Sequence, residues 1–401
     1  MGSTTLCSAV LVVLTIGLTA GAAAPPSGLT VEDGVLMRNG EPYRAMGMNF
    51  FSVFYRRVLD PEDTTWRDGL ETLSRKDVPF IRFMATAFWP SQMELYEEDS
   101  EAFFALLDGV VEAAEELDIG LIPSLFWYDA CVPDLVGEPR SAWGDLDSNT
   151  IAFMRTYTQQ VVTRYKDSPA IWAWEFGNEY DLSIDLPNAA DHRPPIWPNL
   201  GTAESRSEAD DMTLEMLVTA FGEFGRLVRT IDPHRPITSG NATPRPSLHH
   251  QRIEGSWQQD TPEQFKANLA ALHPDPMNML SIHVYPGVVD GYFGRERLTY
   301  RDLLEVCMEA SREIGKPLFV GEFGASFVEE HGGLKASTEK IFEQFDAIEA
   351  TGVPLAAIWN YDLGEEDGPY NITETNERAF IFDRIAESNR RMMSNNLLEE
   401  E

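Results

Sequence analysis

The chain has 401 residues, 43% of them hydrophobic, so it is long enough to bury a large core. Its formal net charge of −34 disfavours binding to nucleic acid, to an anionic membrane surface or to an acidic polysaccharide, because all of these are also negatively charged. A neutral ligand is compatible with this charge, and most of the excess carboxylates are expected on a solvated surface.

Residues 1–24 are predicted to be a signal peptide. An apolar run over residues 9–20 leads into the small residues 21–24, ahead of two prolines. No Lys or Arg precedes the run, so a membrane anchor is the alternative, but the run is short for a span of about 20 residues. We therefore expect a secreted or periplasmic protein that does not stay inserted in a membrane.

Short apolar segments alternate with amphipathic ones along the rest of the chain. Predicted strands cover residues 44–49, 80–84, 120–125, 171–175, 236–239, 279–284, 317–321 and 355–359. Predicted helices cover residues 66–76, 101–117, 150–165, 211–230, 262–272, 300–314, 337–350 and 377–389. Eight such repeats in one domain of residues 25–390 predict an α/β fold, a single (β/α)8 TIM barrel.

The segments that follow predicted strands are long, whereas those that precede strands are short. The long ones cover residues 128–148, 180–210, 240–260 and 285–298. In a barrel these loops form the C-terminal face, where active sites lie. Residues 391–401 are polar and end in three glutamates, so we expect a disordered acidic tail.

The cysteine and histidine residues indicate neither a disulfide framework nor a metal site. Cys7 lies in the predicted signal peptide, and Cys131 and Cys307 are interpreted as free thiols, with a single disulfide bond as the alternative. The pair His249-His250 has no carboxylate or cysteine at convincing ligand spacing. There is also no glycine-rich phosphate loop, so we expect no metal and no cofactor, and we expect a monomer.

Two predicted strands end in a glutamate. Residues 171–180 read Ile-Trp-Ala-Trp-Glu-Phe-Gly-Asn-Glu-Tyr, which places Asn178 and Glu179 just beyond an apolar strand. Residues 317–324 read Pro-Leu-Phe-Val-Gly-Glu-Phe-Gly, which places Glu322 at the end of another. Two carboxylates facing one cleft are what glycoside hydrolysis requires. Glu175, inside the first strand, is expected to be a buried supporting residue.

These two motifs resemble those of clan A glycoside hydrolases, and family 5, the cellulase and β-mannanase family, is the nearest match. Further motifs agree over nearly the whole chain: Arg82 in Ile-Arg-Phe, His283 and Tyr285 in His-Val-Tyr-Pro, and Trp359 in Ile-Trp-Asn-Tyr.

The resemblance implies a role for each of these residues. Glu322 would be the nucleophile, supported by Arg82 and Tyr285, and Glu179 would be the acid/base. Asn178 would bind the sugar 2-hydroxyl, His283 would lie beside Glu179 or the sugar, and Trp359 would form the floor of the sugar site. For the following residues, packing and sugar contact remain equally open: Asn49, Trp89, Trp127, Trp197 and Trp257.

The identity of the sugar is less determined. Many family members carry a histidine after the third strand, whereas residues 124–129 here read Ser-Leu-Phe-Trp-Tyr-Asp. The Ala-Trp-Glu-Phe-Gly-Asn-Glu string of residues 173–179 and the His-Val-Tyr-Pro string of residues 283–286 resemble the mannanase branches of the family. Together with the missing histidine, this resemblance implies an endo-β-1,4-mannanase acting on mannan or glucomannan. The alternatives are a cellulase, an exo-acting β-mannosidase or β-glucosidase, a transglycosylase, and an inactive carbohydrate-binding barrel.

Overall fold

The computed structural model describes residues 28–363 and 368–396, so the predicted signal peptide lies outside the described residues. Eight parallel strands pair in the order β8-β7-β6-β5-β4-β11-β10-β9. The backbone N–H groups of Asn278 and Met279 donate to the carbonyl of Ile237 at 3.1 and 3.2 Å, which links the two ends of this order, β9 and β8. The predicted (β/α)8 barrel is confirmed. Its strands are β4 Ala45–Asn49, β5 Phe80–Met84, β6 Gly120–Phe126, β7 Trp174–Gly177, β8 Ile237–Thr238, β9 Leu280–Val284, β10 Leu318–Phe323 and β11 Leu355–Ile358.

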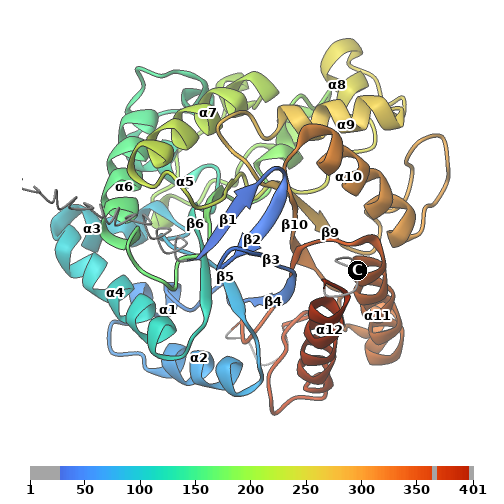
Figure 1. Cartoon of the computed structure of the whole chain (residues 1–401). Helices are drawn as coiled ribbons and strands as arrows, with labels where there is room; N and C mark the ends of the chain where they lie inside the picture. Colours follow the sequence, from blue (N-terminus) through green and yellow to red (C-terminus); the bar gives the residue numbers. More distant parts are fainter. Residues whose placement is uncertain (1–27, 364–367, 397–401) are drawn as a thin grey trace, which may run out of the picture.

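Eight long helices surround the barrel and form the outer ring in Figure 1, close to the predicted positions. They are α2 Thr65–Arg75, α4 Ser100–Glu116, α6 Asn149–Tyr165, α7 Leu214–Ile231, α9 Pro262–Ala271, α10 Tyr300–Ile314, α11 Gly333–Thr351 and α12 Phe380–Asn396. The side chains of Ser148, Thr213, Thr261 and Thr299 accept backbone N–H bonds at helix starts, which satisfies amides that have no intrahelical partner.

Short helices occupy the loops at the C-terminal ends of the strands. They are α1 Tyr55–Leu59, α3 Glu94–Glu98, α5 Cys131–Val136 and α8 Leu248–Glu254, and the sequence patterns did not predict them. The loop after β7 instead contains 3-10 turns, Tyr180–Ser183, Ala189–His192, Pro198–Leu200 and Glu208–Asp210. These elements give the long loops a defined shape.

An antiparallel sheet at the N-terminal face was also not predicted. It consists of β1 Leu29–Glu32, β2 Val35–Arg38 and β3 Glu41–Pro42, and it crosses the centre of the helix ring in Figure 1. Leu29 and Leu36 are 0 and 1% exposed and pack with Phe80, Trp172 and Phe319 inside the barrel. The sheet therefore closes the end of the barrel opposite the long loops.

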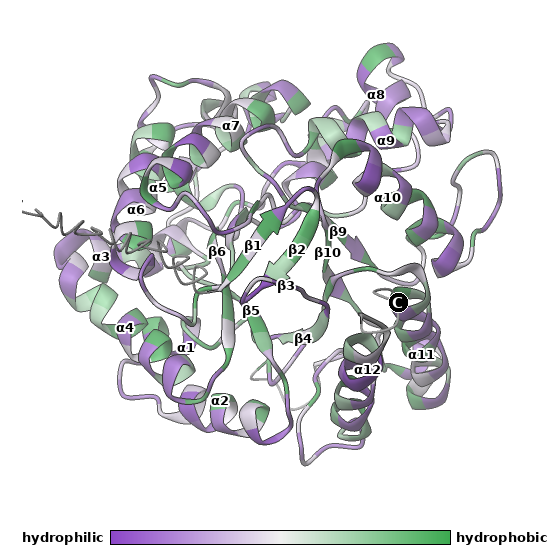
Figure 2. Cartoon of the chain, in the orientation of Figure 1, coloured by the Kyte–Doolittle hydropathy of each residue, from purple (hydrophilic) through white to green (hydrophobic). Residues whose placement is uncertain are grey.

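The barrel interior changes from apolar to polar toward the C-terminal face. Gly47 and Gly120 leave space for the rings of Phe80 and Trp172, because a Cβ at either glycine would overlap the ring. Two residues beyond Gly47 on β4 and Phe80 on β5, the inward positions are polar, and they are Asn49 and Arg82. Figure 2 shows β1, β2 and β5 as mainly hydrophobic, whereas the helices of the outer ring carry both hydrophobic and hydrophilic residues. The polar cluster is thus seated on a packed apolar layer.

The expectation of a disordered tail from residue 391 is wrong for its first residues. Helix α12 continues to Asn396, because Met392 is 1% exposed in the core and Arg391 pairs with Glu349 at 2.6 Å. Residues 397–401 lie outside the described part of the chain. Cys131 and Cys307 are free and buried, as predicted. In residues 28–363 and 368–396, no helix is long and apolar enough to cross a membrane.

Removing an apolar contact between the N-terminal sheet and the barrel interior should destabilise the fold and leave the C-terminal face intact. We expect Leu36→Ala to lower the free energy of unfolding by about 2–5 kcal/mol, because it leaves a cavity against packed rings. Urea unfolding measures the loss, and the exposed Leu59→Ala, at 57% exposure, is the matched control. A loss equal to that of the control would mean that the sheet is not part of the core.

Candidate active site

The predicted site residues converge at the C-terminal ends of the strands, although they are far apart in the chain. Asn49 ends β4, Arg82 lies in β5, Asn178 and Glu179 follow β7, His283 lies in β9 with Tyr285 just beyond it, Glu322 lies in β10, Trp127 follows β6 and Trp359 follows β11. The side chains meet because parallel strands all present their carboxyl ends at one face of the barrel.

Arg82 is fully buried at the centre of this group. Its Nε donates to both oxygens of Glu175, at 2.8 and 2.9 Å. One terminal nitrogen donates to Glu322 at 2.8 Å and to Asn49 at 3.2 Å, and the other donates to Asn178 at 2.8 Å. Burial alone would lower the pKa of Arg82, but the two carboxylates outweigh it and raise that pKa, so the guanidinium stays charged.

Glu322 is 5% exposed and held from both sides. Oε1 accepts from Arg82, and Oε2 accepts from the Tyr285 hydroxyl at 2.6 Å. Burial, followed by the charge of Glu322, raises the pKa of Tyr285 well above its ordinary value, so the phenol keeps the proton that it donates. These two donors fix the position of the carboxylate.

A register shift in β10 directs Glu322 inward. Phe319 faces the barrel interior, and strict alternation would send the side chain at position 322 outward. The pairing with β9 shifts between Val320 and Glu322, as in a β-bulge. Gly321 allows this, because a Cβ there would come within 2.9 Å of the His283 ring.

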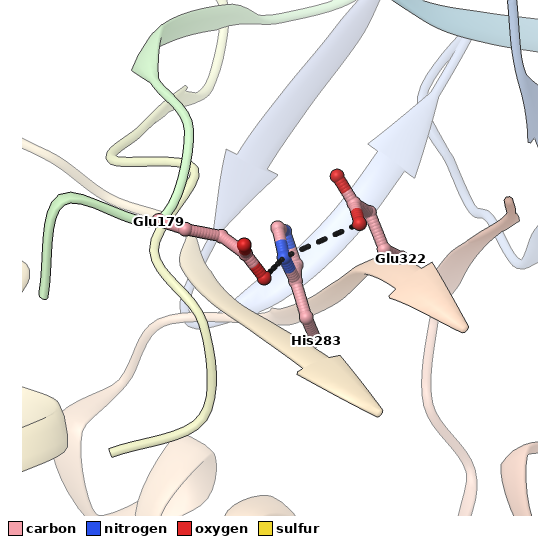
Figure 3. A group of neighbouring side chains, drawn as sticks. All are labelled: Glu179, His283 and Glu322. Carbon is pink, nitrogen blue, oxygen red and sulfur yellow. Dashed lines mark hydrogen bonds and ion pairs between the residues drawn. The ribbon is translucent and has the colours of Figure 1, made fainter. Parts of the chain in front are cut away.

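Glu179 faces the same space from the other side. Its backbone is left-handed, with φ of 55°, and its side chain is 28% exposed. Oε1 lies 2.8 Å from Nδ1 of His283 (Figure 3). Burial raises the pKa of Glu179 above its ordinary value, against a smaller lowering by the Arg82 cation. The raised pKa suits a group that must donate a proton.

His283 lies between the two glutamates in Figure 3, with Nδ1 3.7 Å from Oε2 of Glu322. Burial lowers its pKa to about 3, so the ring is neutral at ordinary pH. A neutral ring that carries its proton on Nδ1 can donate to ionised Glu179. His283 can therefore orient Glu179 without adding a positive charge.

Three potential metal-ligand atoms occur here, one each from Glu179, His283 and Glu322, all within 4.8 Å of one another. Glu322 already accepts from Arg82 and Tyr285, so a cation would have to compete with a guanidinium 2.8 Å away. The group is therefore better suited to proton transfer than to holding an ion. In the part of the chain that the structure describes, the His249-His250 pair on α8 belongs to no such group.

Aromatic rings line the space beside the glutamates. Trp127 lies over the Arg82 guanidinium at 4.5 Å and stacks with Trp359 at 5.9 Å between ring centroids. Phe51 contacts both tryptophan rings, at 5.0 and 6.0 Å. Trp359 is half-buried, so part of its ring is open to a ligand. Phe51 was missed at the sequence level, where only its position just after a predicted strand could have indicated it.

Asn49 was left open between packing and sugar contact, whereas Arg82 was expected to support Glu322. Asn49 and Arg82 are both 0% exposed and have no surface for a sugar. Asn49 donates to the backbone carbonyls of Gly321 and Ala357, at 2.9 and 3.2 Å, and accepts from Arg82. Both residues therefore position other groups. The predicted buried role of Glu175, which is also 0% exposed, is confirmed.

Comparison with known proteins agrees with this geometry. The family model described as Cellulase (glycosyl hydrolase family 5) matches residues 37–363. The chain belongs to glycosyl hydrolase family 5. The family 5 match covers every barrel strand and both candidate catalytic glutamates.

Two curated relatives are mannanases by name. The probable mannan endo-1,4-beta-mannosidase C of Aspergillus terreus is 29% identical over 33% of this chain and 30% of its own length. The probable mannan endo-1,4-beta-mannosidase A of Aspergillus niger is 25% identical over 66% of this chain and 60% of its own length. The family 5 chain thus spans 30 to 60% of the length of these relatives.

Solved structures share the fold. The endo-1,4-beta-mannanase of Rhizomucor miehei superimposes with a TM-score of 0.63, at 15% identity, over 92% of this chain and all of that one. At this identity the likeness supports the family 5 barrel architecture alone.

The two glutamates should affect stability in opposite directions. Because burial raises the folded-state pKa of Glu179, its ionised form opposes folding, and this cost appears as pH rises above the unfolded pKa of about 4.3. Glu179→Gln should therefore raise the thermal midpoint at pH 7, with the gain vanishing below about pH 4. Glu322→Gln should lower the stability by about 1–3 kcal/mol, because a charged hydrogen bond to Arg82 is lost.

Scanning calorimetry of both variants, from below about pH 4 up to about pH 8, measures this contrast. Each change removes one charge and keeps the side-chain shape, so each variant is the control for the other. Equal shifts for the two variants would contradict the assigned environments.

Proposed function

We propose that this protein is a retaining glycoside hydrolase that cleaves β-1,4-linked mannan or glucomannan. The spacing of the two carboxylates carries the proposal, because an oxygen of Glu179 lies within 4.8 Å of an oxygen of Glu322. Retaining enzymes hold their carboxyl groups about 5–5.5 Å apart, whereas inverting enzymes need about 6.5–9.5 Å to admit a water. The difference in environment between the two carboxylates supports distinct roles.

In the first step, Glu322 attacks the anomeric carbon and forms a glycosyl ester. The bond to the leaving oxygen breaks, and Glu179 gives that oxygen its proton. Arg82 and Tyr285 hold the attacking carboxylate in place, so little reorganisation is needed. Glu179 ends this step ionised and can accept a hydrogen bond from His283.

In the second step, Glu179 takes a proton from water, and the oxygen of that water attacks the anomeric carbon. The ester bond breaks, and Glu322 regains its negative charge. While Glu322 is esterified that charge is absent, so the affinity of Glu179 for a proton falls to a level that suits a base.

Asn178 is arranged to contact the sugar. Its Oδ1 accepts from Arg82, which leaves its amide N–H groups to donate to a hydroxyl. We assign them to the 2-hydroxyl, a contact that strengthens in the transition state. The open face of Trp359 supplies an apolar surface for a pyranose ring.

The choice of mannan is supported by the relatives that bear that activity in their names. Cellulose is the second candidate backbone, and exo action on the end of a chain is the alternative mode. The supported glutamate pair argues against an inactive binding barrel. The signal-like residues 1–24 support action outside the cell.

The proposal predicts β-configured product from a β-linked backbone. We expect the protein to hydrolyse mannan or glucomannan faster than carboxymethylcellulose and aryl glycosides, and proton NMR of early product to show the β-anomer first. An α-anomer as the first product would refute the retaining mechanism. Equal or faster cleavage of carboxymethylcellulose would overturn the choice of mannan alone.

The two glutamates should differ in their response to the leaving group. Glu322→Ala should lower kcat at least about 10⁴-fold on every substrate, because the nucleophile is gone. Glu179→Ala should lower kcat strongly on mannan but should form the glycosyl ester normally from a dinitrophenyl glycoside, which needs no acid. Burst kinetics measures this, and the exposed Glu208→Gln is the control. Unchanged hydrolysis by Glu322→Ala would refute the proposal.

A further inference from the structure

A cavity of about 340 Å³ opens beside Glu179, within the range of about 300–1,000 Å³ that is usual for ligand sites. Its lining includes Asn178, Glu179, Tyr128, His192 and Arg193. Glu322 is not part of the lining. The cavity therefore continues the active site on the side of the acid/base.

Aromatic residues extend from this cavity to the surface, and we call them the Trp197 wall: Phe88, Trp89, Tyr128 and Trp197. Tyr128 stacks on Phe88 at 5.0 Å and 4°, and it contacts Trp89 at 5.3 Å. Trp89 in turn contacts Trp197 at 5.0 Å. Trp197 is 47% exposed, so the outer end of the wall presents an indole ring to solvent.

The loop that carries Trp197 is anchored by its own contacts. The backbone N–H of Trp197 donates to Thr202 at 2.6 Å, and that of Leu200 donates to the carbonyl of Trp197 at 2.8 Å. Gly201, with φ of +82°, packs so closely that a Cβ there would lie 2.9 Å from the backbone nitrogen of Ser91. The exposed ring is thus held in place next to Trp89.

The cations that line the cavity are neutralised. Arg193 makes a bidentate pair with Asp211, at 2.7 and 2.8 Å, and Arg140 pairs with Asp129 at 2.5 Å. A protein with a net charge of −34 thus has a cavity whose arginines are paired and whose wall is aromatic. An uncharged ligand with apolar faces, such as a neutral sugar chain, matches this surface.

We propose that the Trp197 wall binds the sugar units on the leaving-group side of the scissile bond, with Trp197 stacking on a unit beyond the first. The side follows from the lining, because Glu179 protonates the leaving oxygen and borders the cavity, whereas the nucleophile does not. The inference rests on the proposed function. It implies that cleavage speeds up when the substrate extends past the first leaving unit, as in endo action.

The test compares a long leaving group with a short one in the same variant. Trp197→Ala should lower kcat/KM on mannohexaose by about 5- to 50-fold, because a stacking surface is lost. It should leave kcat/KM on nitrophenyl β-mannobioside unchanged, because that leaving group ends before Trp197. The pattern of products from mannopentaose should shift as well. Trp197→Tyr should restore most of the kcat/KM on mannohexaose and most of the wild-type product pattern.

Trp257→Ala is the matched control. Trp257 is also exposed, at 59%, but it lies after α8 and is not in the cavity lining among the described residues. It should behave as the wild type on both substrates. If the wild type cleaves mannohexaose and Trp197→Ala has the same kcat/KM on it, the inference is wrong and the proposed function still stands. A wild type that cleaves neither substrate would contradict the proposed function itself.

Discussion

The buried guanidinium of Arg82 is the interaction on which the rest of the site depends. A buried cation is costly unless it is paired, and Arg82 is paired twice, with Glu175 and with Glu322. Its fork-shaped donor set also fixes Asn49 and Asn178, so one side chain ties together four strands or their ends. The apolar layer beneath it excludes water. This strengthens each of these hydrogen bonds and raises the free-energy cost of any buried polar group without a partner.

The charge balance around Arg82 explains why two similar carboxylates can act differently. Glu175 neutralises the guanidinium through Nε, so the negative charge of Glu322 is held but not cancelled. Tyr285 and His283 add hydrogen bonds without adding charge, since the phenol stays protonated and the imidazole stays neutral. Glu179, which lacks a cation within bonding distance among the described residues, keeps a raised pKa. The same cluster therefore holds the carboxylate of Glu322 against a cation and leaves Glu179 with the raised pKa that suits a proton donor.

The sequence predicted those features that depend on local periodicity and on strand ends. Eight strands, their helices and both glutamates were placed correctly, because strand ends in a parallel barrel converge whatever the loops do. The sequence did not show which side chains are buried against distant strands. Asn49 looked like a possible sugar contact until its bonds to the backbone of other strands were seen. The register shift that turns Glu322 inward was signalled only by Gly321, and the packing of Met392 was hidden in a polar tail.

The loops decide what the barrel acts on. Arg82, Glu175 and Asn49 would support hydrolysis of any β-linked sugar, because these fully buried side chains cannot touch the ring substituents that distinguish one sugar from another. Selectivity must then come from groups that border open space, and the cavity beside Glu179 is lined by such groups from the loops after β5, β6 and β7. A neutral, aromatic surface on that side favours the binding of a long uncharged chain and does not favour a substrate with a short leaving group. The surface charge of the protein can vary freely around such a cleft, because the ligand itself carries none.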